Sequence, residues 1–135
     1  MAVYGRSIGG VPALYLATTK PVRAVVLESP FTSARAMAAK HYAFFPRFLM
    51  RVSLDNVSRA SRLSVPLLVF HGTADRVAPV TMGEEVARAG RGTLVRLEGR
   101  DHNDTYESED SVYRNRMWEF LREEGERQGR GKREE

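Results

Sequence analysis

A short glycine-rich segment near the start of the chain has the residue types of a turn that presents a nucleophile. Gly5-Arg6-Ser7-Ile8-Gly9 follows a short apolar run and precedes a helix-like stretch, the context in which the serine of a G-x-S-x-G sequence projects above a sheet. Side chains at positions 5 and 9 would collide with the adjoining strand and helix, and Gly10 extends that clearance. The backbone N–H of Ile8 would face an oxyanion above Ser7. A glycine-rich turn with an incidental serine stays open as the alternative.

A serine hydroxyl needs a base and an orienting carboxylate to become a good nucleophile. His102 lies in a polar loop after one apolar run, and Asp75 lies in the loop after another. Ligand sites of parallel sheets lie outside the carboxyl ends of the strands, so Ser7, Asp75 and His102 can converge although they are far apart in the chain. Of the other histidines, His71 ends an apolar run and is interpreted as a packed strand-end residue, and His41 as a surface or lid residue.

The elements that must position these side chains follow from hydrophobic patterning. Four short apolar runs, at residues 2–4, 22–28, 66–71 and 93–98, predict strands that are covered by helices on both faces. Helices are expected over residues 10–19 and 80–88, with a last one that starts near Ser108. The alternation predicts an α/β fold with a parallel sheet.

The last helix has a predicted core face and a charged end. Tyr113, Met117, Phe120 and Leu121 recur at helical spacing, and Trp118 is also expected in the core. Residues 123–135 are charged and contain no aliphatic side chain, so this segment is expected to be a disordered tail.

The stretch 31–64 reads as irregular and contains an apolar cluster around Tyr42, Phe44, Phe45 and Phe48. One interpretation is an acyl-chain pocket or a lid that touches a membrane surface. The other is an ordinary helix packed on the sheet.

The composition excludes several classes of protein and of functional site. The 135 residues suit one domain of ordinary size, and the absence of cysteine excludes disulfides, thiolate zinc sites and a cysteine nucleophile. The apolar runs are shorter than the ~20 residues of a membrane span, and no signal peptide is visible. Net charge is only +4, without basic runs interleaved with aromatics, so no nucleic-acid partner is expected. We predict a cytoplasmic location.

Taken together, the motifs resemble the C-terminal half of an α/β-hydrolase, with the closest likeness to the acyl-protein thioesterase-like, often membrane-anchored serine hydrolases. The likeness covers residues 1–122 and is carried by the segments 5–10 and 28–33, by His71-Gly72-Thr73-Ala74-Asp75 and by His102-Asn103-Asp104. It implies a partial α/β-hydrolase fold of four parallel strands with flanking helices, N-terminal strands missing, and a cap or lid insertion at 31–64.

The resemblance also implies roles and a reaction. Ser7 would attack an ester or thioester carbonyl of a small-molecule or lipid acyl substrate, and His102 would act as base and then acid. Asp75 would orient His102, with Glu28 as the alternative acid, and the Ile8 amide would bind the oxyanion. No metal or organic cofactor is implied. The predicted substrate contacts are Phe31, Phe44, Phe45 and Phe48. Asp101 departs from the family pattern, and either competes for His102 or faces solvent.

In the family, the strand beside the nucleophile strand and the second oxyanion donor come from the N-terminal half. Without them, the strand at residues 2–4 would be an apolar edge. We therefore expect self-association through this strand and weak activity of the chain alone. The alternative function is a catalytically defective fragment that binds a partner through the exposed edge of its sheet.

Overall fold

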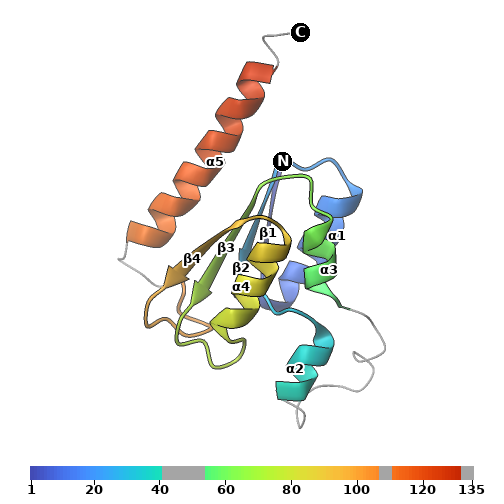
Figure 1. Cartoon of the computed structure of the whole chain (residues 1–135). Helices are drawn as coiled ribbons and strands as arrows, with labels where there is room; N and C mark the ends of the chain where they lie inside the picture. The colour runs from blue at the N-terminus through green and yellow to red at the C-terminus, as the bar shows by residue number, and fades with distance from the viewer. Residues whose placement is uncertain (41–53, 107–110, 132–135) are drawn as a thin grey trace.

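The chain alternates strands and helices along its whole described length. The structure is a computed structural model that describes residues 1–40, 54–106 and 111–131. The elements, traced in Figure 1, are β1 (Ala2–Arg6), the 3₁₀ turn η1 (Ser7–Gly9), α1 (Gly10–Thr19), β2 (Ala24–Glu28), α2 (Ala34–Lys40), α3 (Asn56–Ser61), β3 (Leu67–Gly72), α4 (Val80–Ala89), β4 (Thr93–Leu97) and α5 (Ser111–Gly131).

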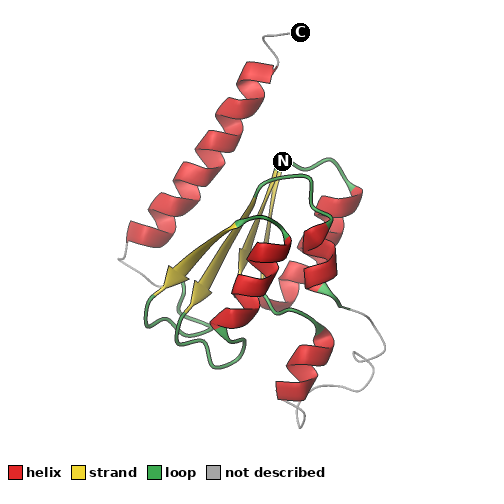
Figure 2. Ribbon diagram, in the orientation of Figure 1, coloured by secondary structure: helices red, strands yellow, loops and turns green. Residues whose placement is uncertain are grey.

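The strands form one parallel sheet in the order of the chain, β1-β2-β3-β4. The register pairs Arg6 with Glu28 and Glu28 with Phe70. All four carboxyl ends therefore point to the same edge of the sheet, where the arrowheads lie in Figure 2. The prediction of four parallel strands with flanking helices is confirmed.

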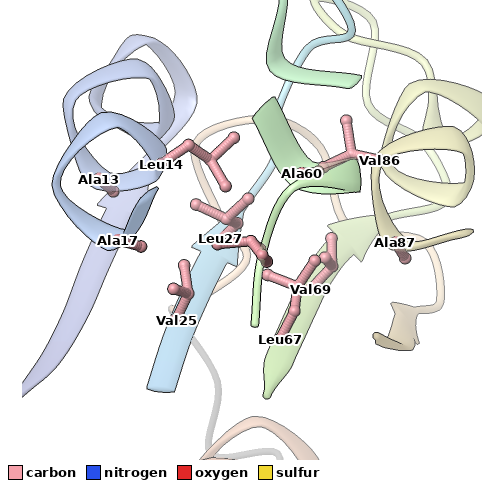
Figure 3. Packing of buried hydrophobic residues seen from close by; sticks show 11 residues of the cluster. Ala13, Leu14, Ala17, Val25, Leu27, Ala60, Leu67, Val69, Val86 and Ala87 are labelled. Carbon is pink, nitrogen blue, oxygen red and sulfur yellow. The ribbon is translucent and has the colours of Figure 1, made fainter. Parts of the chain in front are cut away.

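One face of the sheet packs against α1, α3 and α4. Alternate residues of the strands point toward these helices, as the period of two in a strand requires, and Figure 3 shows Val25, Leu27 and Val69 among the helical side chains. The buried cluster consists of Ala13, Leu14, Ala17, Val25, Leu27, Ala60, Leu63, Leu67, Val69, Val86 and Ala87.

The opposite face packs against α5. Val26, Leu68 and Phe70 point to this side, where the partly buried Tyr113, Met117 and Phe120 of α5 cover them. The rings of Phe70 and Tyr113 lie 4.5 Å apart. The predicted core face of this helix is thus present, but Leu121 is exposed and the prediction for Trp118 is wrong, because its side chain is 72% exposed.

Helix α5 also extends farther than the sequence suggested. A disordered tail was expected from residue 123, whereas the helix continues to Gly131. Arg and Glu have high helix propensity, and Arg127 and Glu124 form an (i, i+3) ion pair at 3.0 Å. The charged composition therefore supports helix rather than disorder over most of this segment.

Two short helices replace part of the irregular stretch expected at 31–64. The carboxylate of Asp55 caps α3 by accepting a hydrogen bond from the Ser58 amide at 2.9 Å. The Asn56 side chain donates to the carbonyl of Phe31 at 2.9 Å, which ties α3 back to the segment that follows β2. His41, Tyr42, Phe44, Phe45 and Phe48 lie outside the described residues, and so do the predictions made for them.

No helix in the described part of the chain combines the length and apolar character needed to cross a membrane.

Candidate active site

The turn between β1 and α1 holds Ser7 in an unusual backbone conformation. Its φ is 50°, in the left-handed region that non-glycine residues seldom adopt. Gly5 makes the tight approach of strand and helix feasible, since a Cβ there would lie 2.5 Å from the Gly9 carbonyl oxygen and 2.7 Å from the Ala13 Cβ. The predicted collision at Gly9 is wrong, because nothing lies within 4 Å of a Cβ placed there.

The three residues predicted to act together do meet. His102 Nε2 lies 2.9 Å from Ser7 Oγ, and His102 Nδ1 lies 2.8 Å from Asp75 Oδ2. Ser7 follows β1, Asp75 follows β3 and His102 follows β4, so the shared edge of the parallel sheet brings them together. Asp75 and His102 are each 7% exposed.

Asp75 is fixed by a tight loop after β3. Its Oδ1 accepts hydrogen bonds from the amides of Val77 at 2.9 Å and Ala78 at 2.8 Å, which leaves Oδ2 for His102. Burial opposes ionisation, but hydrogen bonds from His102, His71 and the Ala78 amide outweigh it and hold the pKa of the Asp75 carboxyl well below its usual value. Asp75 is therefore ionised at neutral pH.

His71 is the packed strand-end residue that the sequence suggested, and it has an additional contact. It is fully buried, with Nε2 2.7 Å from the Ala78 carbonyl oxygen and 3.3 Å from Asp75 Oδ2. A Cβ on Gly83 of α4 would lie 2.3 Å from His71 Nδ1, so α4 packs directly on the imidazole. The position of His71 at the end of β3, four residues before Asp75, was the available signal.

Asp101 contacts the backbone beside the imidazole. Its Oδ1 accepts from the His102 amide at 2.8 Å and from the Arg76 amide at 3.0 Å, and its Oδ2 pairs with the Arg76 guanidinium. Hydrogen bonds from the Arg76 amide, the His102 amide and the Arg76 side chain lower the pKa of Asp101 to about 2. Both ring nitrogens of His102 face Ser7 and Asp75, so the carboxylate of Asp101 does not take the place of Asp75.

The other predicted site residues have different surroundings. Ile8 is 55% exposed beside Ser7. Phe31 is buried in a small cluster with Met37 and Ala78, and its role as a substrate contact stays a prediction. An open pocket of about 550 Å³ adjoins His102, lined by Arg76, Val77, Asp101, His102, Asn103 and Asp104. Within the described ranges, no three His, Asp or Glu side chains form a group that could hold a metal ion.

Sequence reasoning weighed Glu28 only as an alternative acid, but the structure gives it other partners. This fully buried carboxylate accepts hydrogen bonds from the hydroxyls of Tyr4, Thr105 and Tyr113. Arg6, the residue before Ser7, lies beside it with Nε 3.3 Å from Glu28 Oε1. An acidic residue at the end of an otherwise apolar buried strand was the signal for such a network.

No family model matches the chain. Curated relatives share sequence with it. It is 37% identical to an uncharacterised Mycobacterium tuberculosis protein over 109 residues, which cover 77% of this chain and 38% of that protein. It is 34% identical to the human alpha/beta hydrolase domain-containing protein 17B over 110 residues, covering 76% and 35% of the two chains. The chain thus spans little more than a third of the length of these relatives.

Solved structures share its fold. The Pyrococcus furiosus esterase Pf2001 superposes with a TM-score of 0.71 over 90% of this chain and 52% of that one, at 19% identity. An esterase domain from Rhodothermus marinus gives a TM-score of 0.60 at 25% identity, covering 75% of this chain and 50% of that one. Sequence and fold agree, and the predicted relationship is confirmed: the chain is a relative of the α/β-hydrolase superfamily.

Proposed function

We propose that this chain carries the catalytic residues of a serine hydrolase that cleaves an ester or thioester. The observation that carries the proposal is the pair of contacts made by one imidazole, 2.9 Å from Ser7 Oγ and 2.8 Å from Asp75 Oδ2. A serine hydroxyl, an imidazole and a carboxylate connected in this order form the arrangement that a serine nucleophile uses in acyl transfer.

The protonation states follow from the partners. Since Asp75 is ionised, it can only accept, so Nδ1 of His102 carries the proton between them. Nε2 is then the acceptor, and it can take the Ser7 proton as Oγ attacks the acyl carbonyl. Asp75 stabilises the imidazolium that results, and the Ile8 amide donates to the oxyanion.

The remaining steps use the same groups. Collapse of the tetrahedral intermediate breaks the bond to the leaving alcohol or thiol, which takes the proton from His102 Nε2. Water then attacks the acyl-serine with His102 again as base, and the acid is released as Ser7 regains its proton. The pocket next to His102 is open, which suits the entry of an acyl substrate and of water.

The substrate class is proposed from the relatives. Two of the structural neighbours are described as esterases, and the motif likeness to thioesterase-like hydrolases favours an acyl ester or thioester. Phe31 and the phenylalanines at 44, 45 and 48 are the proposed acyl contacts. Binding of a partner through the β1 edge is the competing proposal, since β1 ends the sheet.

A fluorophosphonate probe tests the nucleophile directly. We expect it to label Ser7 in the wild-type chain and to label nothing in Ser7→Ala. Ser29→Ala is the matched control, because Ser29 has a similar φ of 48° but its buried hydroxyl has no hydrogen-bond partner among the residues that the structure describes. Labelling that persists in Ser7→Ala would overturn the assignment of Ser7 as nucleophile, and a wild-type chain that is not labelled at all would favour the partner-binding alternative.

A further inference from the structure

A buried carboxylate near the candidate site has four polar partners, three of which donate hydrogen bonds to it. Glu28 is fully buried at the carboxyl end of β2. Its Oε2 accepts from the Tyr4 hydroxyl at 2.5 Å and from the Tyr113 hydroxyl at 3.0 Å. Its Oε1 accepts from Thr105 and lies 3.3 Å from Arg6 Nε. A carboxylate has about four acceptor positions, and the three hydroxyls fill three of them while the Arg6 guanidinium lies beside Oε1.

Both tyrosines that contact Glu28 stay protonated at neutral pH. Burial, together with the charge of Glu28 and its hydrogen bond, raises the pKa of Tyr113 to about 12. Burial and the hydrogen bond to Glu28 likewise raise the pKa of Tyr4 far above its usual value. Both hydroxyls therefore keep their protons and donate to the carboxylate.

Arg6 continues the network to the base. Its Nη2 donates to the carbonyl oxygen of His102 at 2.7 Å and to Asn103 Oδ1 at 3.2 Å. The guanidinium also lies 5.3 Å from the centre of the Tyr106 ring, within cation–π range. Arg6 precedes the nucleophile directly, so one side chain links the turn of Ser7 to the loop of His102.

The loop after β4 is consequently attached to Glu28 at two points. Thr105 reaches the carboxylate directly, and the His102 carbonyl reaches it through Arg6. Asp75 holds the ring of His102, but a ring can be oriented correctly only if its backbone stays in place. A buried ion pair is weak evidence for a contribution to stability. The location of the partners is more informative, because every one of them lies on β1, on the His102 loop or on α5.

We propose that Glu28 and Arg6 are positioning residues that fix the His102 loop against the nucleophile turn, so that Nε2 stays within reach of Ser7. The predicted effect on reaction rate rests on the proposed function, whereas the predicted effect on the position of the His102 ring does not. Neither residue touches the reacting atoms. Their loss should reduce the fraction of time in which His102 Nε2 is aligned with Ser7 Oγ, and should leave substrate binding nearly unchanged.

The main test replaces Arg6, whose side chain is 32% exposed. In Arg6→Gln we expect kcat for p-nitrophenyl acetate, and the maximal rate of fluorophosphonate labelling, to fall about 10–100-fold with KM changed less than about 3-fold. Arg6→Lys should recover part of the loss, because an ammonium keeps the charge but cannot hold Glu28 and His102 together. Arg96→Gln is the control, since Arg96 also pairs with a glutamate, Glu84, away from the site.

A second readout does not need turnover. The proton on His102 Nδ1 gives a downfield NMR signal when it is held against Asp75, and we expect this signal to broaden or shift in Arg6→Gln and in Thr105→Val. It should remain in Ser7→Ala and Arg96→Gln. Thr105→Val removes the direct attachment to Glu28 at nearly constant volume, so it tests the same proposal through the other contact.

The outcomes separate the two proposals. A wild-type signal together with wild-type labelling in both Arg6→Gln and Thr105→Val would overturn the positioning role. An NMR signal that changes in these variants, in a chain that never labels at Ser7, would support positioning and overturn the hydrolase. A rise in KM with kcat unchanged in Arg6→Gln would assign Arg6 to substrate binding instead.

Discussion

At the scale of single residues, the two oxygens of Asp75 have separate tasks. Oδ1 is held by two backbone amides of its own loop, and Oδ2 faces the imidazole. Glu28 is surrounded by three hydroxyls and Arg6, and its partners occupy the oxygens that a histidine would need. The geometry therefore favours Asp75 as the orienting acid.

Replacement of Asp75 tests this assignment. In Asp75→Asn the amide can donate to His102 Nδ1, which favours the tautomer that carries its proton on Nε2 and cannot accept from Ser7. We expect kcat to fall by about 10⁴-fold, as in the serine-protease precedent, and His102→Ala to be at least as severe. The measurement is ester turnover under saturating substrate.

The neighbouring carboxylate gives the control for this prediction. Asp101→Asn keeps both ring contacts of His102 and alters only backbone and Arg76 contacts, so its turnover should stay within about 10-fold of wild type. Near-normal turnover in Asp75→Asn, with a loss in Glu28→Gln, would transfer the orienting role to Glu28.

At the scale of elements, the turn between β1 and α1 depends on one glycine. Gly5 has no room for a Cβ, because the Gly9 carbonyl and Ala13 of α1 lie against it. The backbone at Gly9 has φ −63° and ψ −15°, an ordinary helical conformation with open space around it. The two glycines of the motif thus have different reasons to be there.

Alanine substitutions should separate these reasons. Gly5→Ala must push α1 away from β1, and we expect a loss of about 1–3 kcal/mol in unfolding free energy together with loss of Ser7 labelling. Gly9→Ala should leave labelling intact and stability unchanged or slightly higher, since alanine restricts the unfolded chain. Urea unfolding and probe labelling measure both. Equal losses in the two variants would show that the turn, rather than the contact at Gly5, sets the requirement.

The sequence predicted the elements that follow local rules and missed those that depend on tertiary contacts. Buried parallel strands are nearly continuous apolar runs, so β2 and β3 were located within about two residues of their bounds. Helix α3 has six residues and depends on the Asp55 cap and on Asn56 bonding to Phe31, a contact 25 residues away. No periodic pattern can indicate such a helix.

The site was predictable to a similar extent. Ser7, Asp75 and His102 stand at strand ends, and topology alone brings strand ends together. The partners of Glu28 were not predictable, because Tyr113 reaches it from α5 over 85 positions and Thr105 over 77. Only the tertiary packing of α5 and of the loop before it brings these hydroxyls to one carboxylate.

At the scale of the whole molecule, α5 covers its face of the sheet with one side only. Tyr113, Met117 and Phe120 share the buried side, whereas Trp118 follows Tyr113 by five positions and points about 140° away at 100° per residue. Trp118 is 72% exposed and borders a surface hollow with Glu119, Leu121 and Arg122.

The single tryptophan of the chain reports on this surface. We expect the fluorescence of folded Trp118 to have an emission maximum close to that of the urea-unfolded chain, and acrylamide to quench it nearly as well in both states. Phe120→Ala should weaken α5 docking without altering this emission. A strongly blue-shifted, poorly quenched folded state would mean that another surface covers Trp118 in solution.

Synthesis on the ribosome delivers the three side chains one after another, with Ser7 first and His102 last. At about 5–20 residues per second, the 95 positions between Ser7 and His102 take roughly 5–20 s to translate. Throughout that interval the nascent chain carries Ser7 without His102, and Glu28 without Thr105 and Tyr113, which emerge later still. Any acyl-transfer activity would therefore begin only after the loop that carries His102 has left the exit tunnel.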